Sequence, residues 1–476
     1  MTAVVPAPPA PPLDLSRPLR LHVIGVGGPG MSAIAIALAE MGHRVSGSDL
    51  REQPSLERVR AAGVDVRVGH DPDVVDGCDA VVASTAIPES NMEWRAAHDR
   101  GVLAMRRAGM LASICACARA VAVAGTHGKT TTTSMLMLML AEGGLAPSFV
   151  VGGDVNDAGT GAQWTRSEWL VVEADESDGT HVALPLAASI LTNVEVDHLD
   201  HFGTPEAIVE SFDTYLAQVP GAKVVGIDEP WARQLAAAHG ATTYGLSADA
   251  DVRAVDVRAD HGSFRFAVEC RTGDRHDRLG TVALPLRGRH NVQNALGAIA
   301  MALAIGVPFD ACARALERFG GVGRRFDIRG VDGGATFVDD YGHLPGEISA
   351  VISAARDSGD GWQRVIVAFQ PNRFARVESM SRDFADAFVG ADVVAIADIY
   401  ASGTTPIPGV TSKLIVDAVL DAHPDIRIVW LPRREDLVSF LAGEAGPGDV
   451  CISMGCGDIA TLPEEVLARR AARRLA

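Results

Sequence analysis

The sequence predicts an α/β protein of three domains: a Rossmann-like N-terminal domain, a central P-loop ATPase-like domain with a parallel sheet, and a Rossmann-like C-terminal domain. Three observations support this fold class. The chain of 476 residues is too long for one ordinary core. Short apolar runs alternate with helical patterns and glycine-marked turns. Finally, two glycine loops each lie between a predicted strand and a predicted helix.

The expected domain boundaries follow changes in composition. Residues 1–18 are proline-rich and predict a disordered tail, not a signal peptide, because no basic segment precedes an apolar one. Residues 19–119 are expected to form the first domain, 120–325 the second and 326–476 the third. The glycine- and arginine-rich stretch Phe319–Gly330 is expected to be a linker or hinge between the last two.

Charge and cysteine usage narrow the classes of protein. A net charge of −18 argues against a general nucleic-acid or anionic-membrane surface. The seven cysteines include no CxxC pair, which is typical of reduced thiols in a cytoplasmic protein. No apolar run is long enough to span a bilayer. We therefore expect a soluble cytoplasmic protein with no nucleic-acid and no membrane partner.

The first glycine loop predicts a nucleotide site. The strand Leu21–Gly25 is followed by an apolar helix from Met31 onward, and glycines 25, 27 and 30 allow a backbone to approach a pyrophosphate at the helix N-terminus. Asp49, at the end of the next predicted strand Arg44–Asp49, is placed to accept a ribose hydroxyl. Alone, this fingerprint fits a nicotinamide or flavin enzyme as well as any other nucleotide protein.

The stretch "VAVAGTHGKTTTTS" predicts a triphosphate site. A strand, Ala120–Ala124, leads into a glycine loop, and a lysine with hydroxyl residues opens the helix Thr131–Ala141. Backbone N–H groups of the loop can cradle phosphates, Lys129 can neutralise the β- and γ-oxygens, and Thr130 can ligate Mg²⁺. This is a compact loop, since the usual longer form would have glycine at Val123. The alternative is a glycine turn with a solvent-facing lysine.

Acidic residues follow the next buried strand, Trp169–Glu173. Ligands in open α/β sheets lie at the carboxyl ends of strands, and a carboxylate beside Thr130 suits a hard Mg²⁺ ion. Glu173 is therefore the preferred metal ligand, and a solvated acidic loop is the alternative for at least two of the four acids. The four acids of this cluster are Glu173, Asp175, Glu176 and Asp178.

Two further polar groups leave alternatives open. After the strand Ala188–Thr192, one residue of a second cluster either completes a metal site or is surface polarity; its members are Asp197, His198, Asp200 and His201. Asn291 and Asn294, at the start of the helix Val292–Ala304, share one face. An asparagine there can pair with adenine or cap the helix.

The remaining predicted strands complete the βα rhythm of the second and third domains. They are Lys223–Ile227, Thr336–Asp339, Arg364–Phe369, Val393–Asp398, Ile426–Trp430 and Val450–Ser453.

Seven motifs occur in the order seen in the Mur ligases: "GVGGPGMSAIA", "GTHGKTTTTSML", "VVEADESDG", "TNVEVDHLDHFG", "GRHNVQNALGA", "GVGRRFD" and "VDDYGHLPGEI". The chain resembles this family from Leu21 to Ile459, and within it the alanine-adding branch. The resemblance implies a magnesium- and ATP-dependent ligase joining L-alanine to the carboxylate of UDP-N-acetylmuramate through an acyl phosphate. Such an enzyme acts in peptidoglycan synthesis, and so in cell wall biogenesis, cell shape and cell division. The first glycine loop would then face the diphosphate of a UDP-sugar.

The resemblance also implies roles for individual residues. The UDP-sugar would be bound by Gly25, Gly27, Gly28, Gly30, Met31, Ser32, Asp49, Ser84 and Thr85. ATP would be bound by Gly125, Thr126, His127, Gly128, Lys129, Thr130, Thr131, Asn291, Asn294, Arg325, Asp340 and Tyr341. The metal ligands would be Thr130, Glu173 and His198, and the catalytic residues Lys129, His198, His343, Arg373 and Arg376. The expected partners are these small molecules, with the chain a monomer or weak homodimer.

The third domain departs from the family pattern. Leu344, Asn372 and Phe374 stand where the family has histidine, histidine and tyrosine; the loop 401–409 lacks an acid, and Cys456 replaces an alanine. These changes leave open a paralogue that adds another amino acid or acts on a related acid. A non-catalytic nucleotide-binding regulatory homologue is the alternative of another class, and a dehydrogenase is more remote. No lysine lies between Lys129 and Lys223, so a carbamylated lysine is not expected.

Overall fold

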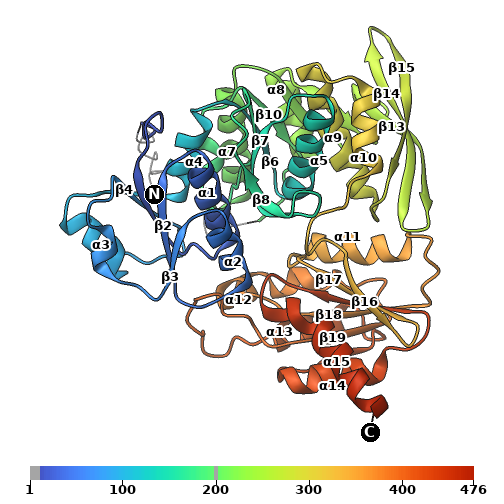
Figure 1. Ribbon diagram of the computed structural model, residues 1–476. Coiled ribbons are helices and arrows are strands. Elements are labelled where there is room, and N and C mark those ends of the chain that lie inside the picture. The colour runs from blue at the N-terminus through green and yellow to red at the C-terminus, as the bar shows by residue number, and fades with distance from the viewer. Residues whose placement is uncertain (1–10, 198–201, 476) are drawn as a thin grey trace. The chain divides into compact units, whose positions relative to one another are not determined.

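The computed structural model describes residues 11–197 and 202–475 (Figure 1). Their strands form three sheets, and helices alternate with the strands along the chain, which confirms the predicted α/β class. The chain divides into two compact units and crosses from one to the other after Gly321; residues 258–265 and 285–291 are grouped with the second unit. The first two sheets' glycine loops therefore belong to one unit. The three domain boundaries stay a prediction.

The first sheet is parallel throughout and has the order β3-β2-β1-β4-β5. The strand order reverses beside β1, and ligands of doubly wound sheets bind at the carboxyl end of such a switch point. The first glycine loop, between β1 and α1, lies there. The elements are β1 Arg20–Ile24, α1 Pro29–Glu40, β2 Arg44–Asp49, α2 Pro54–Ala61, β3 Asp65–Val68, η1 Pro72–Val75, β4 Ala80–Ala83, α3 Met92–Asp99, β5 Leu103–Arg106 and α4 Arg107–Cys115.

The second sheet has ten strands in the order β15-β14-β13-β12-β11-β10-β6-β9-β7-β8. Its centre, from β12 to β7, is parallel as predicted. The strands are β6 Arg119–Ala124, β7 Ser148–Val155, β8 Thr160–Gln163, β9 Trp169–Glu173, β10 Ala188–Leu191, β11 Lys223–Gly226, β12 Thr242–Gly245, β13 Val252–Asp260, β14 Ser263–Thr272 and β15 Arg275–Leu284. The helical elements are α5 Lys129–Glu142, η2 Thr180–Ala183, α7 Pro205–Gln218, α8 Pro230–His239, α9 Arg289–Ile305 and α10 Phe309–Glu317.

Both ends of this sheet extend beyond the predicted strands. At one end β8 pairs antiparallel with β7. At the other, β13, β14 and β15 are joined by two-residue connections, which only hairpins allow. These strands were not predicted from the sequence, and they make the central sheet mixed and not wholly parallel.

The third sheet, in the second unit, has the order β16-β17-β21-β18-β19-β20. It is parallel except for β16, which pairs antiparallel with β17. The elements are β16 Asp327–Asp332, β17 Ala335–Asp340, α11 Pro345–Arg356, β18 Arg364–Phe369, α12 Phe374–Met380, η3 Ser381–Phe384, β19 Val393–Ile396, α13 Lys413–Ala422, β20 Ile428–Trp430, α14 Arg434–Glu444, β21 Asp449–Met454, η4 Asp458–Thr461 and α15 Leu462–Leu475.

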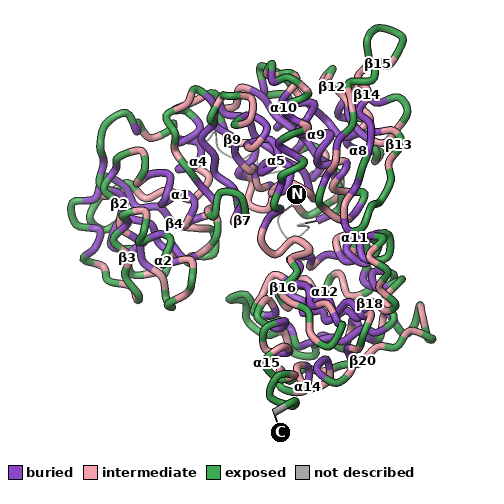
Figure 2. Tube along the Cα trace, turned by 45° about the vertical axis from the view of Figure 1, so that its right-hand side comes forward, coloured by how far each residue is buried: buried purple, intermediate pink, exposed green. Residues whose placement is uncertain are grey.

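The central parallel strands, such as β4, β10, β19 and β21, are buried throughout, as Figure 2 shows for the interior of each unit, whereas the edge strands β3, β5 and β20 are partly exposed. In α5, Met135 and Met139 are fully buried, which confirms that these methionines pack in the core. Among the helices of residues 11–197 and 202–475, none has the length and apolar character that a membrane crossing needs.

The part of the predicted tail that the structure describes packs against the first unit. Leu15 and Leu19 are buried in its core, and the backbone N–H of Leu13 donates to Ser113 Oγ at 2.9 Å. The expectation of a free tail over residues 1–18 is therefore wrong from residue 11 onward, because leucines in this proline-rich stretch find apolar surface to cover.

A buried carboxylate holds the strand ends of the first sheet. Glu93 Oε2 accepts a hydrogen bond from Ser48 Oγ at 2.5 Å and contacts His70 Nδ1 at 2.9 Å, while Oε1 accepts from the backbone N–H of Asp71 at 3.0 Å. His22 Nε2 lies 3.5 Å from the same carboxylate. Burial raises the pKa of Glu93, but hydrogen bonds from its neighbours outweigh burial and hold the pKa below its usual range.

We expect Glu93→Gln to lower the free energy of unfolding by about 1.5–3 kcal/mol near neutral pH, because buried donors lose a charged acceptor. A lowered pKa stabilises the fold above the unfolded value of about 4.3, and this stabilisation is lost as pH falls through the folded value. The difference in thermal midpoint from wild type should therefore shrink below about pH 4.3. Glu168→Gln, which breaks the exposed Arg119–Glu168 pair, is the control and should cost less than about 1 kcal/mol. Equal shifts in both variants would contradict the assignment.

Candidate active site

The second glycine loop requires glycine at two positions. Gly125 has φ +125° and Gly128 has φ +80°, conformations that side chains rarely adopt. A Cβ on Gly125 would collide with Thr192 Oγ1, and one on Gly128 with Asn294 Oδ1. The loop therefore lies as close as a bare backbone allows to the end of β10 and to α9.

The segment after β10 fixes the loop by hydrogen bonds. Thr192 Oγ1 donates to the carbonyls of His127 at 2.6 Å and Ala124 at 3.2 Å. The backbone N–H of Thr126 donates to the Asn193 carbonyl at 3.1 Å, and that of His127 to Asn193 Oδ1 at 2.8 Å. Thr192 and Asn193 were not predicted as site residues, although both belong to the motif "TNVEVDHLDHFG".

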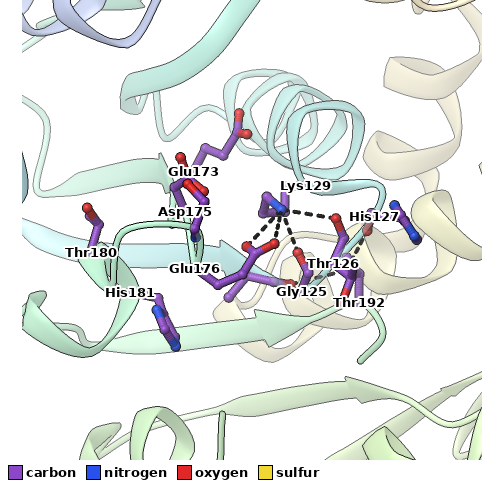
Figure 3. A network of polar contacts seen from close by, with 12 residues as sticks. Gly125, Thr126, His127, Lys129, Glu173, Asp175, Glu176, Thr180, His181 and Thr192 are labelled. Atoms are coloured by element: carbon purple, nitrogen blue, oxygen red, sulfur yellow. Dashed lines mark hydrogen bonds and ion pairs between the residues drawn. The ribbon is translucent and has the colours of Figure 1, made fainter. Parts of the chain in front are cut away.

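Lys129, the first residue of α5, turns back over the loop (Figure 3). Its Nζ donates to the carbonyls of Gly125 at 2.7 Å and Thr126 at 3.1 Å and lies 2.8 Å from Glu176 Oε2. Burial lowers the pKa of Lys129, but the charges of Glu176 and Asp175 outweigh it and raise the pKa. The alternative of a solvent-facing lysine is wrong.

Glu176 is the buried counterion of this lysine. Only 3% of its side chain is exposed. Burial raises the pKa of Glu176 to about 7, although the charge of Lys129 acts in the opposite direction. The ammonium thus has an anionic partner that a triphosphate would have to replace or share.

Glu173 and Thr130 form a pair of oxygen donors at the end of β9. Thr130 Oγ1 donates to Glu173 Oε1 at 3.2 Å, and Glu173 Oε2 accepts from the backbone N–H of Gly152 at 2.9 Å. A hydroxyl and a carboxylate beside a phosphate loop fit Mg²⁺, which takes few protein ligands and completes its shell with phosphate and water. Residues 11–197 and 202–475 contain no group of three or more His, Cys, Asp or Glu residues that could hold a metal. His198, a predicted ligand, lies outside the described residues, as do Asp200 and His201; Asp197 is buried.

The other two acids of this loop pair with α4. Arg107 NH2 donates to Asp175 Oδ2 at 2.7 Å and to Asp178 Oδ2 at 2.8 Å. Burial raises the pKa of Asp175, but Arg107 and Lys129 outweigh it and hold the pKa well below its usual range. All four acids therefore have partners within the protein, and the alternative of a solvated acidic loop is wrong. Arg107 was not predicted from the sequence.

The first glycine loop is held by β2. The backbone N–H of Gly25 donates to the Ser48 carbonyl at 2.8 Å, and that of Gly27 to Asp49 Oδ2 at 2.9 Å. Gly28 is the N-cap of α1, with Pro29 following at the first helical position. Asp49, predicted to accept a ribose hydroxyl, thus has one carboxylate oxygen on the loop itself.

The remaining predicted UDP-sugar residues lie around this loop or at the end of β4. Gly30 and Met31 are in the first turn of α1, with Met31 buried, and Ser32 Oγ donates to the Pro29 carbonyl at 2.8 Å. Ser84 and Thr85 follow β4, the strand next to β1 across the switch point.

The two asparagines of α9 have different surroundings. Asn294 is buried against Gly128, and so lies at the phosphate loop. Asn291, the third residue of α9, donates from Nδ2 to the carbonyl of Arg287 at 2.7 Å, a contact that is not an N-cap, since a capping side chain accepts from backbone N–H groups. Thr131, also predicted to bind ATP, is buried in the first turn of α5.

In the second unit, an aromatic ring is flanked by cations. The guanidinium groups of Arg324 and Arg325 lie 5.2 Å and 5.1 Å from the ring centroid of Tyr341. His343 contacts the same ring edge-on at 5.5 Å, and its Nδ1 lies 3.3 Å from Glu347 Oε2. Arg325, from one motif, and Tyr341 and His343, from another, are thus neighbours.

Asp340 is buried beside this group. Its two oxygens accept from the backbone N–H groups of Phe326 and Gly342, each at 2.7 Å. Burial raises the pKa of Asp340 to about 6, while the charge of Arg325 acts to lower it. The carboxylate ties β17 to the start of β16.

Two of the departures from the family pattern, Leu344 and Asn372, are buried, whereas Phe374 and Cys456 are partly exposed and most of the loop 401–409 is exposed. Asn372 Oδ1 accepts from Arg376 NH1 at 2.7 Å, and Leu344 is the buried N-cap residue of α11. Arg373, at the N-cap of α12, has φ +59°, an unusual conformation for a non-glycine residue. Asn372 therefore positions one of the two predicted catalytic arginines.

Comparison with known proteins places all three sheets in one family. The model described as "Mur ligase family, catalytic domain" matches residues 20–119, "Mur ligase middle domain" residues 123–302, and "Mur ligase, glutamate ligase domain" residues 324–457.

Similar proteins match along nearly the whole chain. The UDP-N-acetylmuramate–L-alanine ligase of Bradyrhizobium diazoefficiens is 42% identical over 447 residues, covering 92% of this chain and 95% of that protein. The ligase of the same name from Azorhizobium caulinodans is 43% identical over 446 residues, with the same coverage. The structure of UDP-N-acetylmuramate–alanine ligase from Thermotoga maritima matches with a TM-score of 0.80 and 26% identity, covering 96% of this chain and 100% of that one.

We expect Gly125→Ala to weaken ATP binding by at least about tenfold, because the added methyl group collides with Thr192 and displaces the phosphate-binding backbone. Gly144→Ala is the matched control: Gly144 has φ +83° but no heavy atom within 4 Å of the new methyl group. Both variants should lower the thermal midpoint, and only the first should lose affinity in a calorimetric titration with ATP. Equal ATP affinity in the two variants would show that the loop does not bind phosphates.

Proposed function

Because the chain belongs to the Mur ligase family, we propose that it is an ATP-dependent ligase that joins L-alanine to the carboxylate of UDP-N-acetylmuramate in peptidoglycan precursor synthesis. The observation that carries the proposal is similarity of 42–43% along nearly the whole chain to ligases of that name. The reaction consumes ATP, and its other products are ADP and phosphate.

The reaction needs activation because a carboxylate has no good leaving group. Transfer of the γ-phosphoryl group to the carboxylate gives an acyl phosphate, and the amine of alanine then attacks through a tetrahedral intermediate that expels phosphate. Lys129 lies on the phosphate loop and would offset the negative charge that develops on the transferring oxygens. The first loop would hold the diphosphate of the UDP-sugar at the N-terminus of α1.

We further propose that Mg²⁺ is held by Thr130 and Glu173, with His198 as an additional ligand. The pair of Thr130 hydroxyl and Glu173 carboxylate at the end of β9 supports the first two ligands, and the family motif supports His198. The bound ion would neutralise phosphate charge.

For the second unit we propose roles in ATP and amino-acid recognition. Arg325, Asp340 and Tyr341 would contact ATP; Asn291 and, from the first unit, Asn294 would contact its adenine. The side chains of His343, Arg373 and Arg376 would bind the acyl phosphate and the α-carboxylate of alanine. The cluster of Arg325, Tyr341 and His343 and the Asn372–Arg376 hydrogen bond support this assignment.

The alternatives are less well supported. A binding protein without catalytic function has no need for a lysine and a hydroxyl–carboxylate pair beside a phosphate loop, and both are present. A dehydrogenase would not need the second loop at all. We propose a cytoplasmic location: all seven cysteines lie in the described part of the chain and are free thiols, as in a reducing compartment.

The test is ATP-dependent phosphate release with UDP-N-acetylmuramate and a panel of L-alanine, glycine, L-serine and other amino acids. We expect release that requires all three substrates, with the highest kcat/KM for L-alanine. Preference for another amino acid would overturn the specificity, and no release with any amine would overturn the ligase assignment.

We expect Lys129→Ala to lower kcat by at least about 100-fold while UDP-N-acetylmuramate affinity stays within about twofold, because the two loops belong to different sheets. Lys413→Ala is the control: Lys413 is an exposed lysine of α13 paired with Asp417 at 2.6 Å, and its loss should leave both quantities unchanged. Single-turnover kinetics and calorimetry measure the two effects. Lost UDP-sugar affinity in Lys129→Ala, measured without ATP, would contradict the assignment of the two loops to different ligands.

We expect Asn372→Ala to raise the KM for L-alanine by about tenfold, with the KM for ATP little changed, because Arg376 loses the acceptor that orients it. Ser379→Ala, which removes an exposed hydroxyl of the same helix, is the control. Steady-state kinetics at saturating UDP-sugar give both constants. An unchanged KM for alanine, or an equal change in the KM for ATP, would show that this asparagine does not serve amino-acid binding.

A further inference from the structure

Arg107 lies at the start of α4 and contacts two parts of the first unit that are distant in sequence. It follows Arg106, whose guanidinium donates to the carbonyls of Ser84 and Ile87 and lies 4.1 Å from the ring centroid of Trp94. The Arg106 side chain therefore makes its contacts within the part of the chain that forms the first sheet. The Arg107 side chain instead reaches the acidic loop after β9.

One nitrogen of Arg107 holds the acidic loop. NH2 makes both contacts to Asp175 and Asp178, at 2.7 Å and 2.8 Å, and only 21% of the side chain is exposed. Asp175 adjoins Glu176, the counterion of Lys129. The position of this guanidinium is thus tied to the residues around the phosphate loop.

The other nitrogen faces the first glycine loop. A methyl group built on Gly30 would lie 3.2 Å from Arg107 NH1 and 3.7 Å from its Cδ. Gly30 is in the first turn of α1, where unpaired backbone N–H groups and the helix dipole attract anions. A guanidinium at this point adds a full positive charge and further donors to the same place.

We propose that Arg107 binds the diphosphate of the UDP-sugar through NH1 while NH2 keeps the acidic loop in position, so that occupancy of one site strengthens binding at the other. This inference rests on the proposed function. The planar guanidinium suits the role because it presents donors in two directions, whereas a lysine ammonium cannot span both anions in a fixed geometry. Coupling of this kind is reciprocal: ATP would also increase affinity for the UDP-sugar.

The first experiment compares uridine, UMP and UDP as probes of the full-length chain by calorimetry. Arg107→Met should weaken UDP binding by about tenfold or more and leave uridine affinity unchanged, with UMP affected less than UDP, because only the diphosphate reaches the guanidinium. Arg58→Met is the matched control: it breaks another arginine–aspartate pair, Arg58–Asp154 at 2.7 Å, between α2 and β7. Equal affinity for UDP in Arg107→Met and wild type would overturn the inference.

The second experiment measures ATP affinity with and without UDP-N-acetylmuramate. The UDP-sugar should strengthen ATP binding in wild type and in Arg58→Met, and the gain should be absent in Arg107→Met. A residue that only stabilised the fold would lower the thermal midpoint and leave the gain intact, which would overturn the coupling. If Arg107→Met does not fold, Arg107→Lys, which keeps the charge, gives the same comparison and should lose most of the gain.

The two proposals fail differently. Wild-type chain that binds no UDP-N-acetylmuramate would overturn the proposed function, and the inference with it. Wild-type chain that binds it and turns it over, together with an unaffected Arg107→Met, would overturn the inference alone.

Discussion

The balance of charge at the carboxyl end of β9 governs the arrangement of the candidate site. Four carboxylates follow this strand within six residues, and two described cations, Lys129 and Arg107, pair with three of them. Glu173 is the exception: its hydrogen-bond partners within the described residues are the Thr130 hydroxyl and the backbone N–H of Gly152. An excess of negative charge at one point, with two hard oxygen donors side by side, is the condition under which a divalent cation binds favourably. The same excess of negative charge explains why the side chains of Lys129 and Arg107 are largely buried beside these carboxylates.

The strands and helices around this charge cluster were largely predictable, because hydrophobic periodicity and the positions of glycines are visible in each short stretch of sequence. The strands Arg44–Asp49, Trp169–Glu173 and Arg364–Phe369 have the predicted bounds. Helix α5 begins two residues earlier than predicted, at Lys129, since the positive φ of Gly128 ends the loop directly before the lysine. The hairpins β13 to β15 were missed: their strands are partly exposed and alternate irregularly, so their apolar pattern does not separate them from a loop.

Contacts between distant segments could not be read from the sequence. Thr130 and Glu173 were paired correctly because both belong to recognisable motifs at the ends of neighbouring strands. Arg107 and Thr192 act through partners 65 to 71 positions away, and nothing in their own neighbourhoods indicates those partners. Asn372 was noted as a departure from a histidine, and only the structure shows that its amide faces Arg376.

The contact between Gly128 and Asn294 has a consequence for the history of this chain. The side-chain oxygen of Asn294 occupies the space that a Cβ at position 128 would fill. Helix α9 therefore packs against the loop as closely as a glycine backbone allows. Position 128 is restricted twice, because a side chain there would collide with Asn294 and would also be strained by the positive φ. In any lineage that descends from this sequence, glycine should therefore remain at 128 even where residue 294 becomes smaller.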